Sequence, residues 1–191
     1  MIETRIHVIK IAPILMLILP MITQGQSLQM NPNSTLSIYG TSNVHDWSEH
    51  CESPSGIVEI NEVNGEITAI SSLHFNTKAE SIKSGKSTMD EYTYEALKSK
   101  SHPNIEFEAT DISVNKTTAG YKVLANGTMS IAGQSREEQI STNCTYHNKS
   151  LKCEGKKSID MTLYGIEPPS IMFGAMTVGK DVEVHFETSF N

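Results

Sequence analysis

Histidine and carboxylate side chains, which could bind a metal or transfer protons, are scattered along this chain. No two histidines have the spacing that a metal-binding helix needs, and no glutamate lies between such a pair. The G-x-S-x-G, P-loop and dinucleotide-binding motifs are also absent. Strand pairing could still bring two histidines together, so an enzyme remains the competing class. We nevertheless expect no catalytic residue and no metal ligand among these side chains, namely His45, His50, His74, His102, His147, His185, Glu106 and Glu108.

The cysteines favour a different chemistry. Cys144 and Cys153 flank a segment that can form a hairpin with a two-residue turn at Asn148 and Lys149, and this register places the two thiols opposite each other. A cross-strand disulfide is the natural interpretation for an exported chain, and two reduced thiols are the alternative. Cys51 is left over. It could be a buried thiol, exchange for one of the other two, or link a homodimer.

The first 25 residues have the parts of a signal peptide. A positively charged start is followed by an apolar run, Ile11–Ile22, that only prolines interrupt. This run is shorter than the roughly 20 residues that a membrane-spanning helix needs, so we expect no stable membrane insertion. Small residues at Thr23 and Gly25 suit cleavage after Gly25. The sequence thus predicts a periplasmic or secreted protein with one domain, residues 26–191.

The charge of the chain limits its partners. The formal net charge is −7 at pH 7, and no stretch forms a basic patch. Nucleic acid is therefore a poor partner, and an anionic membrane surface would not attract the protein.

A short amphipathic helix is predicted over residues 88–100. Thr88 and Glu91 have the spacing of a capping box at its start, and Pro103 ends it. Helical periodicity then places one mostly apolar face along Met89, Tyr92, Thr93, Ala96 and Leu97.

Most of the remaining chain has strand periodicity, and Asn64-Gly65 is typical of a type I′ hairpin turn. We expect roughly eight antiparallel strands, drawn from Thr35–Tyr39, Ser42–Trp47, Gly56–Ile60, Glu66–Phe75, Asn104–Val114, Tyr121–Ile131, Gln139–Tyr146, Leu151–Met161 and Val182–Phe190.

The strands could bury their apolar faces in a sandwich or in a barrel. Small residues are expected on the inward faces, where they would leave volume unfilled: Ala69, Ser71, Ala109, Ala125 and Gly127. They hint at a cavity, but closely packed sheets would also use them. Asn126-Gly127 reads locally as a hairpin turn, although a turn there would leave only a short ribbon. A continuous strand is the better interpretation, because glycine inside a strand often marks a close approach.

Several motifs together resemble the YceI-like family of exported, lipocalin-like bacterial proteins. They are His102-Pro103-Asn104-Ile105-Glu106-Phe107, the run Gly127-Thr128-Met129-Ser130-Ile131-Ala132-Gly133, Met172-Phe173-Gly174-Ala175-Met176 and Val178-Gly179-Lys180-Asp181. Residues 42–47 resemble the start of the family's second strand. The resemblance implies an all-β fold, an extended antiparallel eight-stranded barrel with one short helix packed at the barrel. It also implies a long apolar tunnel that holds a polyisoprenoid, an isoprenoid quinone or a fatty-acid derivative, with no required cofactor.

The inward-facing side chains that are large and soft are the candidates for the lining of such a tunnel: Phe75, Phe107, Met129, Val184 and Phe186, with Met172, Phe173 and Met176 from the segment before the last strand. Trp47 could contact the ligand or close one end. A polar headgroup could bind His45, Asp46 and Tyr94, although His45 could equally hydrogen-bond backbone. For each of these residues, ordinary core packing is the alternative.

The sequence therefore predicts an exported lipid-binding protein that holds a hydrophobic small molecule for transport, storage or sequestration. A structural or interaction module without a ligand is the first alternative. An enzyme acting on a lipid-like substrate is the second.

Overall fold

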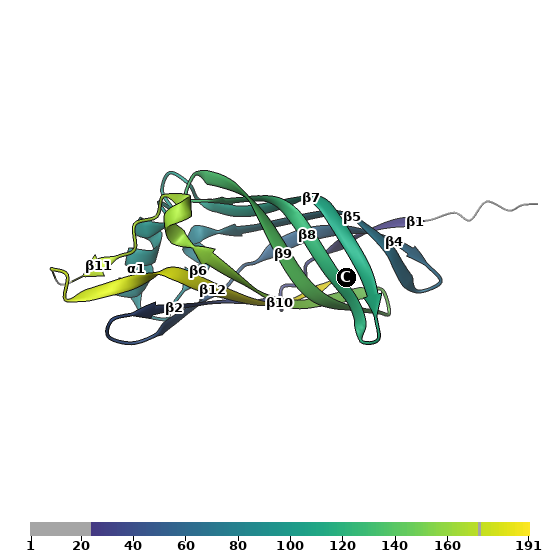
Figure 1. Ribbon diagram of the computed structural model, residues 1–191, viewed down its shortest axis with the longest axis horizontal. Coiled ribbons are helices and arrows are strands. Elements are labelled where there is room, and N and C mark those ends of the chain that lie inside the picture. The colour runs from purple at the N-terminus through teal and green to yellow at the C-terminus, as the bar shows by residue number, and fades with distance from the viewer. Residues whose placement is uncertain (1–23, 172) are drawn as a thin grey trace, which may run out of the picture.

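The computed structural model describes residues 24–171 and 173–191, and Figure 1 shows them as an elongated, strand-rich molecule. The predicted signal peptide lies outside these residues, apart from Gln24 and Gly25 at the start of the first strand. The elements in chain order are β1 (Gln24–Gln29), β2 (Thr35–Ser42), β3 (Trp47–Cys51), β4 (Ser55–Val63), β5 (Glu66–Lys78), η1 (Ala79–Ser81), β6 (Ile82–Lys83), α1 (Ser87–Ala96), β7 (Asn104–Thr117), β8 (Gly120–Ile131), β9 (Gln134–His147), β10 (Ser150–Asp160), η2 (Met161–Tyr164), β11 (Ser170–Ile171) and β12 (Met176–Phe190).

The strands form one curled antiparallel sheet. Its order is β1-β4-β5-β7-β8-β9-β10-β12-β2-β3-β6, and β11 adds to β12. Two joins draw the ends of this path together. Gln29 and Asn191 exchange backbone hydrogen bonds of 3.0 and 2.9 Å, so the end of β1 meets the end of β12. At the other join, β6 follows β5 through η1 and pairs with β3.

The predicted all-β, lipocalin-like fold is therefore confirmed, with more strands than the eight expected. The additional strands are short: β1, β3, β6 and β11 have between two and six residues. Such short segments show too few alternations for periodicity to identify them.

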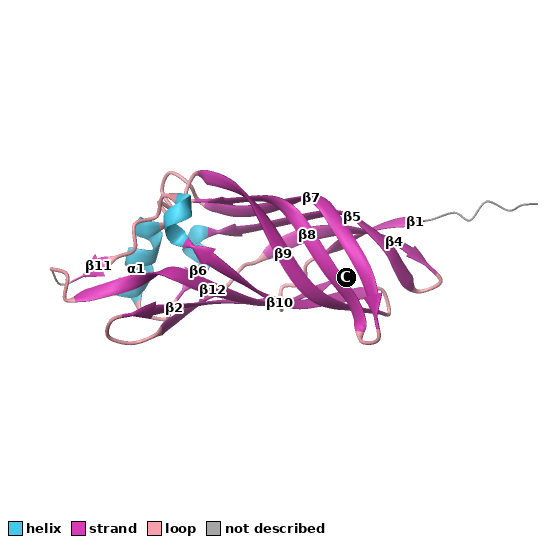
Figure 2. Ribbon diagram, in the orientation of Figure 1, coloured by secondary structure: helices cyan, strands magenta, loops and turns pink. Residues whose placement is uncertain are grey.

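The two ends of the molecule differ in secondary structure (Figure 2). At one end, which we call the hairpin end, the β4–β5, β7–β8 and β9–β10 hairpins turn. At the other, the helix end, α1, η1 and η2 gather. The expected turns form at Asn64-Gly65 and at Asn148-Lys149, where both residues of each pair have positive φ.

The hairpin end has a packed core. Its buried side chains come from strands on several sides of the shell and contact one another: Leu28, Val58, Ile60, Ile67, Ile70, Tyr121, Val123, Cys144, Leu151 and Phe190. The hydroxyl of Tyr121 accepts a hydrogen bond from the backbone N–H of Ile67 at 3.1 Å, which ties β8 to β5. This core closes one end of the shell.

The predicted capping box does not form. α1 begins at Ser87, and its N-cap residue, Lys86, makes no side-chain capping bond. Asp90 instead accepts hydrogen bonds from the backbone N–H and the hydroxyl of Ser84, at 2.7 and 2.6 Å. The helix also ends earlier than the expected residue 100, because Lys98 adopts a positive φ of 54°.

Two strand interpretations need correction. Residues 43–46 form a turn and not a strand, because the hydroxyl of Ser42 accepts hydrogen bonds from the N–H groups of Val44 and His45. In β5, irregularities in the pairing with β4 change the alternation. Ile70 is buried as a result, whereas Ser71, expected to face inward with Ala69, is exposed.

The continuous strand at Asn126-Gly127 is confirmed, since β8 runs through it. A β-carbon added at Gly127 would lie 2.1 Å from the carbonyl oxygen of Glu108 on β7. Glycine is required here because the two backbones approach too closely for any side chain.

Candidate functional site

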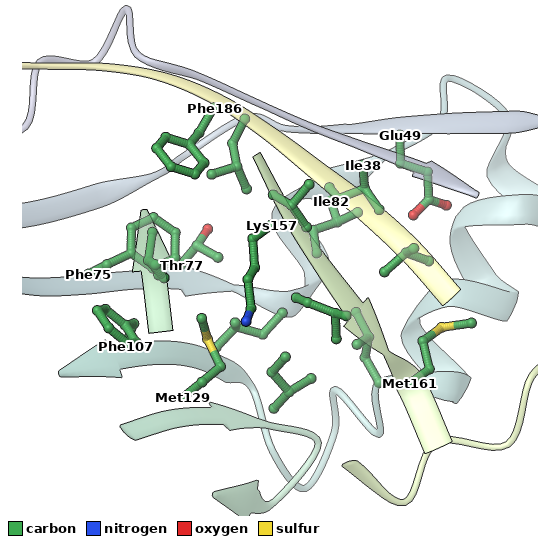
Figure 3. Close-up of a pocket in the computed structure, with 18 of the residues that line it drawn as sticks. Ile38, Glu49, Phe75, Thr77, Ile82, Phe107, Met129, Lys157, Met161 and Phe186 are labelled. Atoms are coloured by element: carbon green, nitrogen blue, oxygen red, sulfur yellow. The ribbon is translucent and has the colours of Figure 1, made fainter. Parts of the chain in front are cut away.

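A cavity of about 330 Å³ lies inside the shell. This volume falls within the range of about 300–1,000 Å³ that is typical of small-molecule sites. Figure 3 shows part of the wall, where aromatic, aliphatic and methionine side chains from different strands converge. The lining is mostly apolar, so the cavity offers little to water and suits an apolar ligand.

Strand alternation brings most of the predicted site residues together here. Eight of them line the cavity: His45, Trp47, Phe75, Phe107, Met129, Met176, Val184 and Phe186. They come from the β2–β3 turn and from five strands, β3, β5, β7, β8 and β12, and reach one space because the sheet curls. Whether they contact a ligand is a separate prediction.

Three predicted site residues are not found in this wall. Tyr94 is not a lining residue, and its hydroxyl accepts a hydrogen bond from Lys83 and donates one to the backbone carbonyl of Glu80. Phe173 lies between β11 and β12 with its side chain fully exposed. Met172 lies outside the described residues. Asp46, considered for a headgroup, is exposed and does not line the cavity.

The roof of the cavity comes from α1. The apolar face predicted from helical periodicity lines the space directly, through Met89, Tyr92, Thr93, Ala96 and Leu97. The periodicity identified this face, but only the fold shows that it borders a cavity. The floor comes from the packed core of the hairpin end, through Val58, Ile70, Val123, Leu151 and Phe190.

Trp47 stands at the helix end of the wall. Its indole N–H donates to the backbone carbonyl of Thr41 at 3.1 Å, and its ring covers Gly40. A β-carbon at Gly40 would lie 2.1 Å from that ring, so glycine is needed for the ring to lie flat on β2. The exposed His45 lies nearby, and its Nδ1 is 2.9 Å from the carbonyl oxygen of Asp46.

The sheet opens on one side of the cavity. The β9–β10 pairing stops at Thr142 and Gly155, although β9 and β10 continue to pair with β8 and β12 beyond this point. The ammonium of Lys157 bridges the opening, because it donates to the carboxylate of Glu138 at 2.5 Å and to the carbonyl of Gln139 at 3.2 Å. The opening thus has a polar seal.

Glu138 is the centre of this seal. The hydroxyl of the fully buried Tyr164 donates to its second oxygen at 3.0 Å. Burial opposes ionisation of the carboxyl, but the hydrogen bonds from Lys157 and Tyr164 outweigh it and hold the pKa of Glu138 below its usual value. Burial, together with the Glu138 carboxylate, raises the pKa of Tyr164. The ammonium of Lys157 is therefore already neutralised.

Glu49 is the acidic residue in the cavity lining of the described residues, and the sequence interpretation missed it. Its side chain is on β3, and only 4% of the residue is exposed. The hydroxyl of Thr93 on α1 donates to one carboxyl oxygen at 2.5 Å. Burial raises the pKa of Glu49, and neighbouring Asp90 adds to the effect, while Thr93 and His50 oppose it.

The predicted disulfide is present between Cys144 and Cys153. Cys51 is free and buried, with its sulfur 2.9 Å from the hydroxyl oxygen of Thr77. Of the three fates considered for Cys51, the structure therefore matches the buried thiol.

Two further observations concern only residues 24–171 and 173–191. No group of three or more histidine, cysteine, aspartate or glutamate side chains could hold a metal ion there. None of the helices in these ranges has the length and apolarity needed to cross a membrane.

Comparisons with known proteins agree with this architecture. BcnA of Burkholderia cenocepacia superposes with a TM-score of 0.68 at 13% identity, covering 82% of this chain and 95% of BcnA. A polyisoprenoid binding domain from Saccharophagus degradans, implicated in plant cell wall breakdown, gives 0.66 at 10% identity, with 86% and 97% covered. The YceI protein of Campylobacter jejuni gives 0.57 at 14% identity, with 74% and 82% covered.

Identities this low show a shared fold and nothing finer. No curated protein matches the chain. The profile of the YceI-like domain, however, matches residues 35–190. The match spans the sheet from β2 to β12, together with α1 and the whole cavity wall described above. On this basis the chain belongs to the YceI-like family.

Proposed function

We propose that this protein is an exported carrier that holds an isoprenoid, or a similar molecule with a long apolar tail, in the cavity for transport, storage or sequestration. The observation behind the proposal is the cavity of about 330 Å³, which apolar side chains line from the floor at the hairpin end to the roof at α1. A binding role is favoured over a catalytic one because the polar side chains at the cavity are few and mostly satisfied by one another.

The energetics of such binding need no charged partner. Burial of apolar surface contributes roughly 25 cal/mol per Å², so each prenyl unit that enters the cavity adds to affinity. Met129 and Met176 are suited to this role, because an unbranched thioether adapts to a flexible ligand. The structural similarity to a polyisoprenoid binding domain supports a prenyl chain over other apolar tails.

The proposal can be tested with the fluorescence of Trp47, which is the only tryptophan in the chain and lines the cavity. We expect titration with farnesol to change this emission in a saturable way. Ala125→Leu would occupy part of the space and should weaken binding about tenfold or more, since one buried side chain of this size displaces a comparable part of the ligand.

A matched control is Ala119→Leu, which makes the same change in the exposed β7–β8 turn. This variant should bind farnesol as the wild type does. If the wild type shows no saturable change, or if the two variants bind alike, the cavity is not the binding site and the proposal fails.

A further inference from the structure

Glu49 occupies an unusual place for a carboxyl group. It lines an apolar cavity, it is 4% exposed, and among the described residues no lysine, arginine or histidine forms an ion pair with it. A buried carboxylate without a cation is costly, so such a group normally either keeps its proton or has a specific partner. Nothing in the fold of β3 requires an acid at this position.

The hydrogen bonding of Glu49 is incomplete. The hydroxyl of Thr93 is the only described group that hydrogen-bonds the carboxyl, and it uses one of the two oxygens. Figure 3 shows the carboxyl group next to α1, at the edge of the wall formed by Ile38 and Ile82. One carboxyl oxygen is therefore left for a molecule inside the cavity.

The surrounding charges do not favour an anion. Asp90 faces Glu49 from α1, His50 is its neighbour on β3, and His45 lines the same cavity from the β2–β3 turn. Lys157 is the only lysine or arginine in the lining of the described residues, and Glu138 and Gln139 already accept hydrogen bonds from it. A phosphate or carboxylate head would thus meet a carboxyl group and find no free cation.

We propose that Glu49, positioned by Thr93, binds the polar head of the ligand and selects lipids with a neutral head, such as a hydroxyl or carbonyl, against phosphorylated ones. The head lies at the helix end under α1, and the tail runs toward Val58, Leu151 and Phe190 at the floor. A protonated Glu49 donates to a carbonyl or hydroxyl oxygen. An ionised Glu49 accepts from a hydroxyl but repels a phosphate. This inference rests on the proposed lipid-binding function and adds the class of headgroup to it.

Because the pKa of Glu49 is raised, the preference for neutral heads over anionic ones should depend on pH. As pH rises through that pKa, the carboxyl gains negative charge and the penalty for an anionic head grows. Binding of a prenol should change little, because its hydroxyl can either accept or donate.

The test compares farnesol with farnesyl diphosphate, followed by Trp47 fluorescence at about pH 5 and about pH 8. At the higher pH we expect the wild type to bind farnesol at least tenfold more tightly than farnesyl diphosphate, since like charges placed together in a buried site are strongly unfavourable. Glu49→Gln removes the charge and keeps a similar shape. It should bind the diphosphate about tenfold more tightly than the wild type does at the higher pH, with farnesol affinity nearly unchanged.

One control and one further variant keep the result interpretable. Glu59→Gln makes the same change at an exposed site on β4 and should match the wild type with both probes. Thr93→Val removes the hydroxyl that orients Glu49 and should weaken farnesol binding about five- to tenfold, the usual effect of one lost hydrogen bond.

Equal binding of the two probes by the wild type at both pH values would overturn the role of Glu49 and leave the proposed function intact. The role would also fail if Glu49→Gln did not change the preference. Binding of neither probe would instead contradict the proposed function itself. The wild-type comparison needs no variant, so a folding defect in Glu49→Gln would not prevent a decision.

Discussion

The hairpin end and the helix end of the shell share the long strands β5, β7, β8, β9, β10 and β12, and both point alternate side chains inward, but the cavity lies toward the helix end, whereas the hairpin end is packed. There, Ile60 is fully buried and Tyr121 reaches across to the backbone of Ile67. At the helix end the β9–β10 ladder has already stopped, so the walls stand further apart, and α1 covers the space without filling it. Alternation therefore decides which residues face inward, whereas the spacing of the walls decides whether those side chains meet.

If the two ends differ in this way, truncating a side chain should cost far more at the hairpin end. Ile60→Ala would create a new cavity in a packed core and should lower the free energy of unfolding by about 2–5 kcal/mol. Ile140→Ala only enlarges an existing cavity and should cost about 1 kcal/mol. Urea denaturation of both variants would measure the difference. Equal losses would mean that the two ends are packed alike.

The disulfide should stabilise the hairpin end, where Cys153 also lines the cavity. Cys144 and Cys153 are nine residues apart, and closing a loop of this size stabilises a fold by about 2–3 kcal/mol in the chain-entropy description. A variant with both cysteines replaced by serine should therefore lose about this much stability in denaturant. Farnesol binding should stay within about twofold, since Cys153 is one lining residue among many, and a larger loss of affinity would show that the disulfide shapes the floor of the cavity.

Enlarging a side chain should likewise cost more stability at the hairpin end than at the cavity wall. Ala125→Leu adds atoms at the cavity wall, where space is free, and should change stability by less than about 1 kcal/mol. Ile67→Phe adds atoms inside the packed core and should cost about 1–3 kcal/mol. Thermal unfolding of the two variants tests the contrast, which a strong destabilisation by Ala125→Leu would remove.

The smallest effect on stability is expected from replacing Asp160, the acid that caps η2 at the helix end. Asp160 accepts hydrogen bonds from Lys180 at 2.5 Å and from the hydroxyl and N–H of Thr162 at 2.6 and 3.0 Å. These bonds lower the pKa of Asp160 from 3.8 to about 2. Because the folded-state pKa is below the unfolded one, the stabilisation is present above the unfolded value and disappears as pH falls through about 2.

Asp160→Asn should therefore unfold at a lower temperature than the wild type at about pH 5, and the difference should shrink toward pH 2. Asp111→Asn, at an exposed carboxyl on β7, is the control and should show no such convergence. If the difference in unfolding temperature between Asp160→Asn and the wild type stayed constant with pH, ionisation of Asp160 would not stabilise η2.

Much of the fold could be predicted from the sequence because its strands are long and their alternation is regular. β7, β8 and β10 are predicted nearly within their observed bounds, and the type I′ turn at Asn64-Gly65 follows from residues that tolerate positive φ. The bulges in β5 at Thr68 and Ser71, on either side of Ile70, could not be predicted. A bulge depends on the pairing of two strands, and it reverses the faces of the residues that follow it.

The candidate site was predictable to the extent that it follows from alternation. Phe107 and Met129 pair directly across β7 and β8, and both line the cavity. Phe173 was expected there because it is apolar, but no strand periodicity constrains a residue at the tip of a hairpin. Glu49 was missed for the opposite reason, since a lone acid in a short strand is ordinarily solvated, whereas here it is buried and hydrogen-bonded to Thr93 of α1.

Native mass spectrometry of the protein purified from its source organism, followed by solvent extraction, tests most directly whether the helix end holds a lipid. We predict a bound species that solvent releases and whose mass corresponds to a molecule with a prenyl or similar hydrocarbon tail. It should be absent, or much reduced, in Ala125→Leu prepared in the same way. Detection of only the bare protein mass, in a sample that also fails to take up added farnesol, would contradict a lipid-holding cavity.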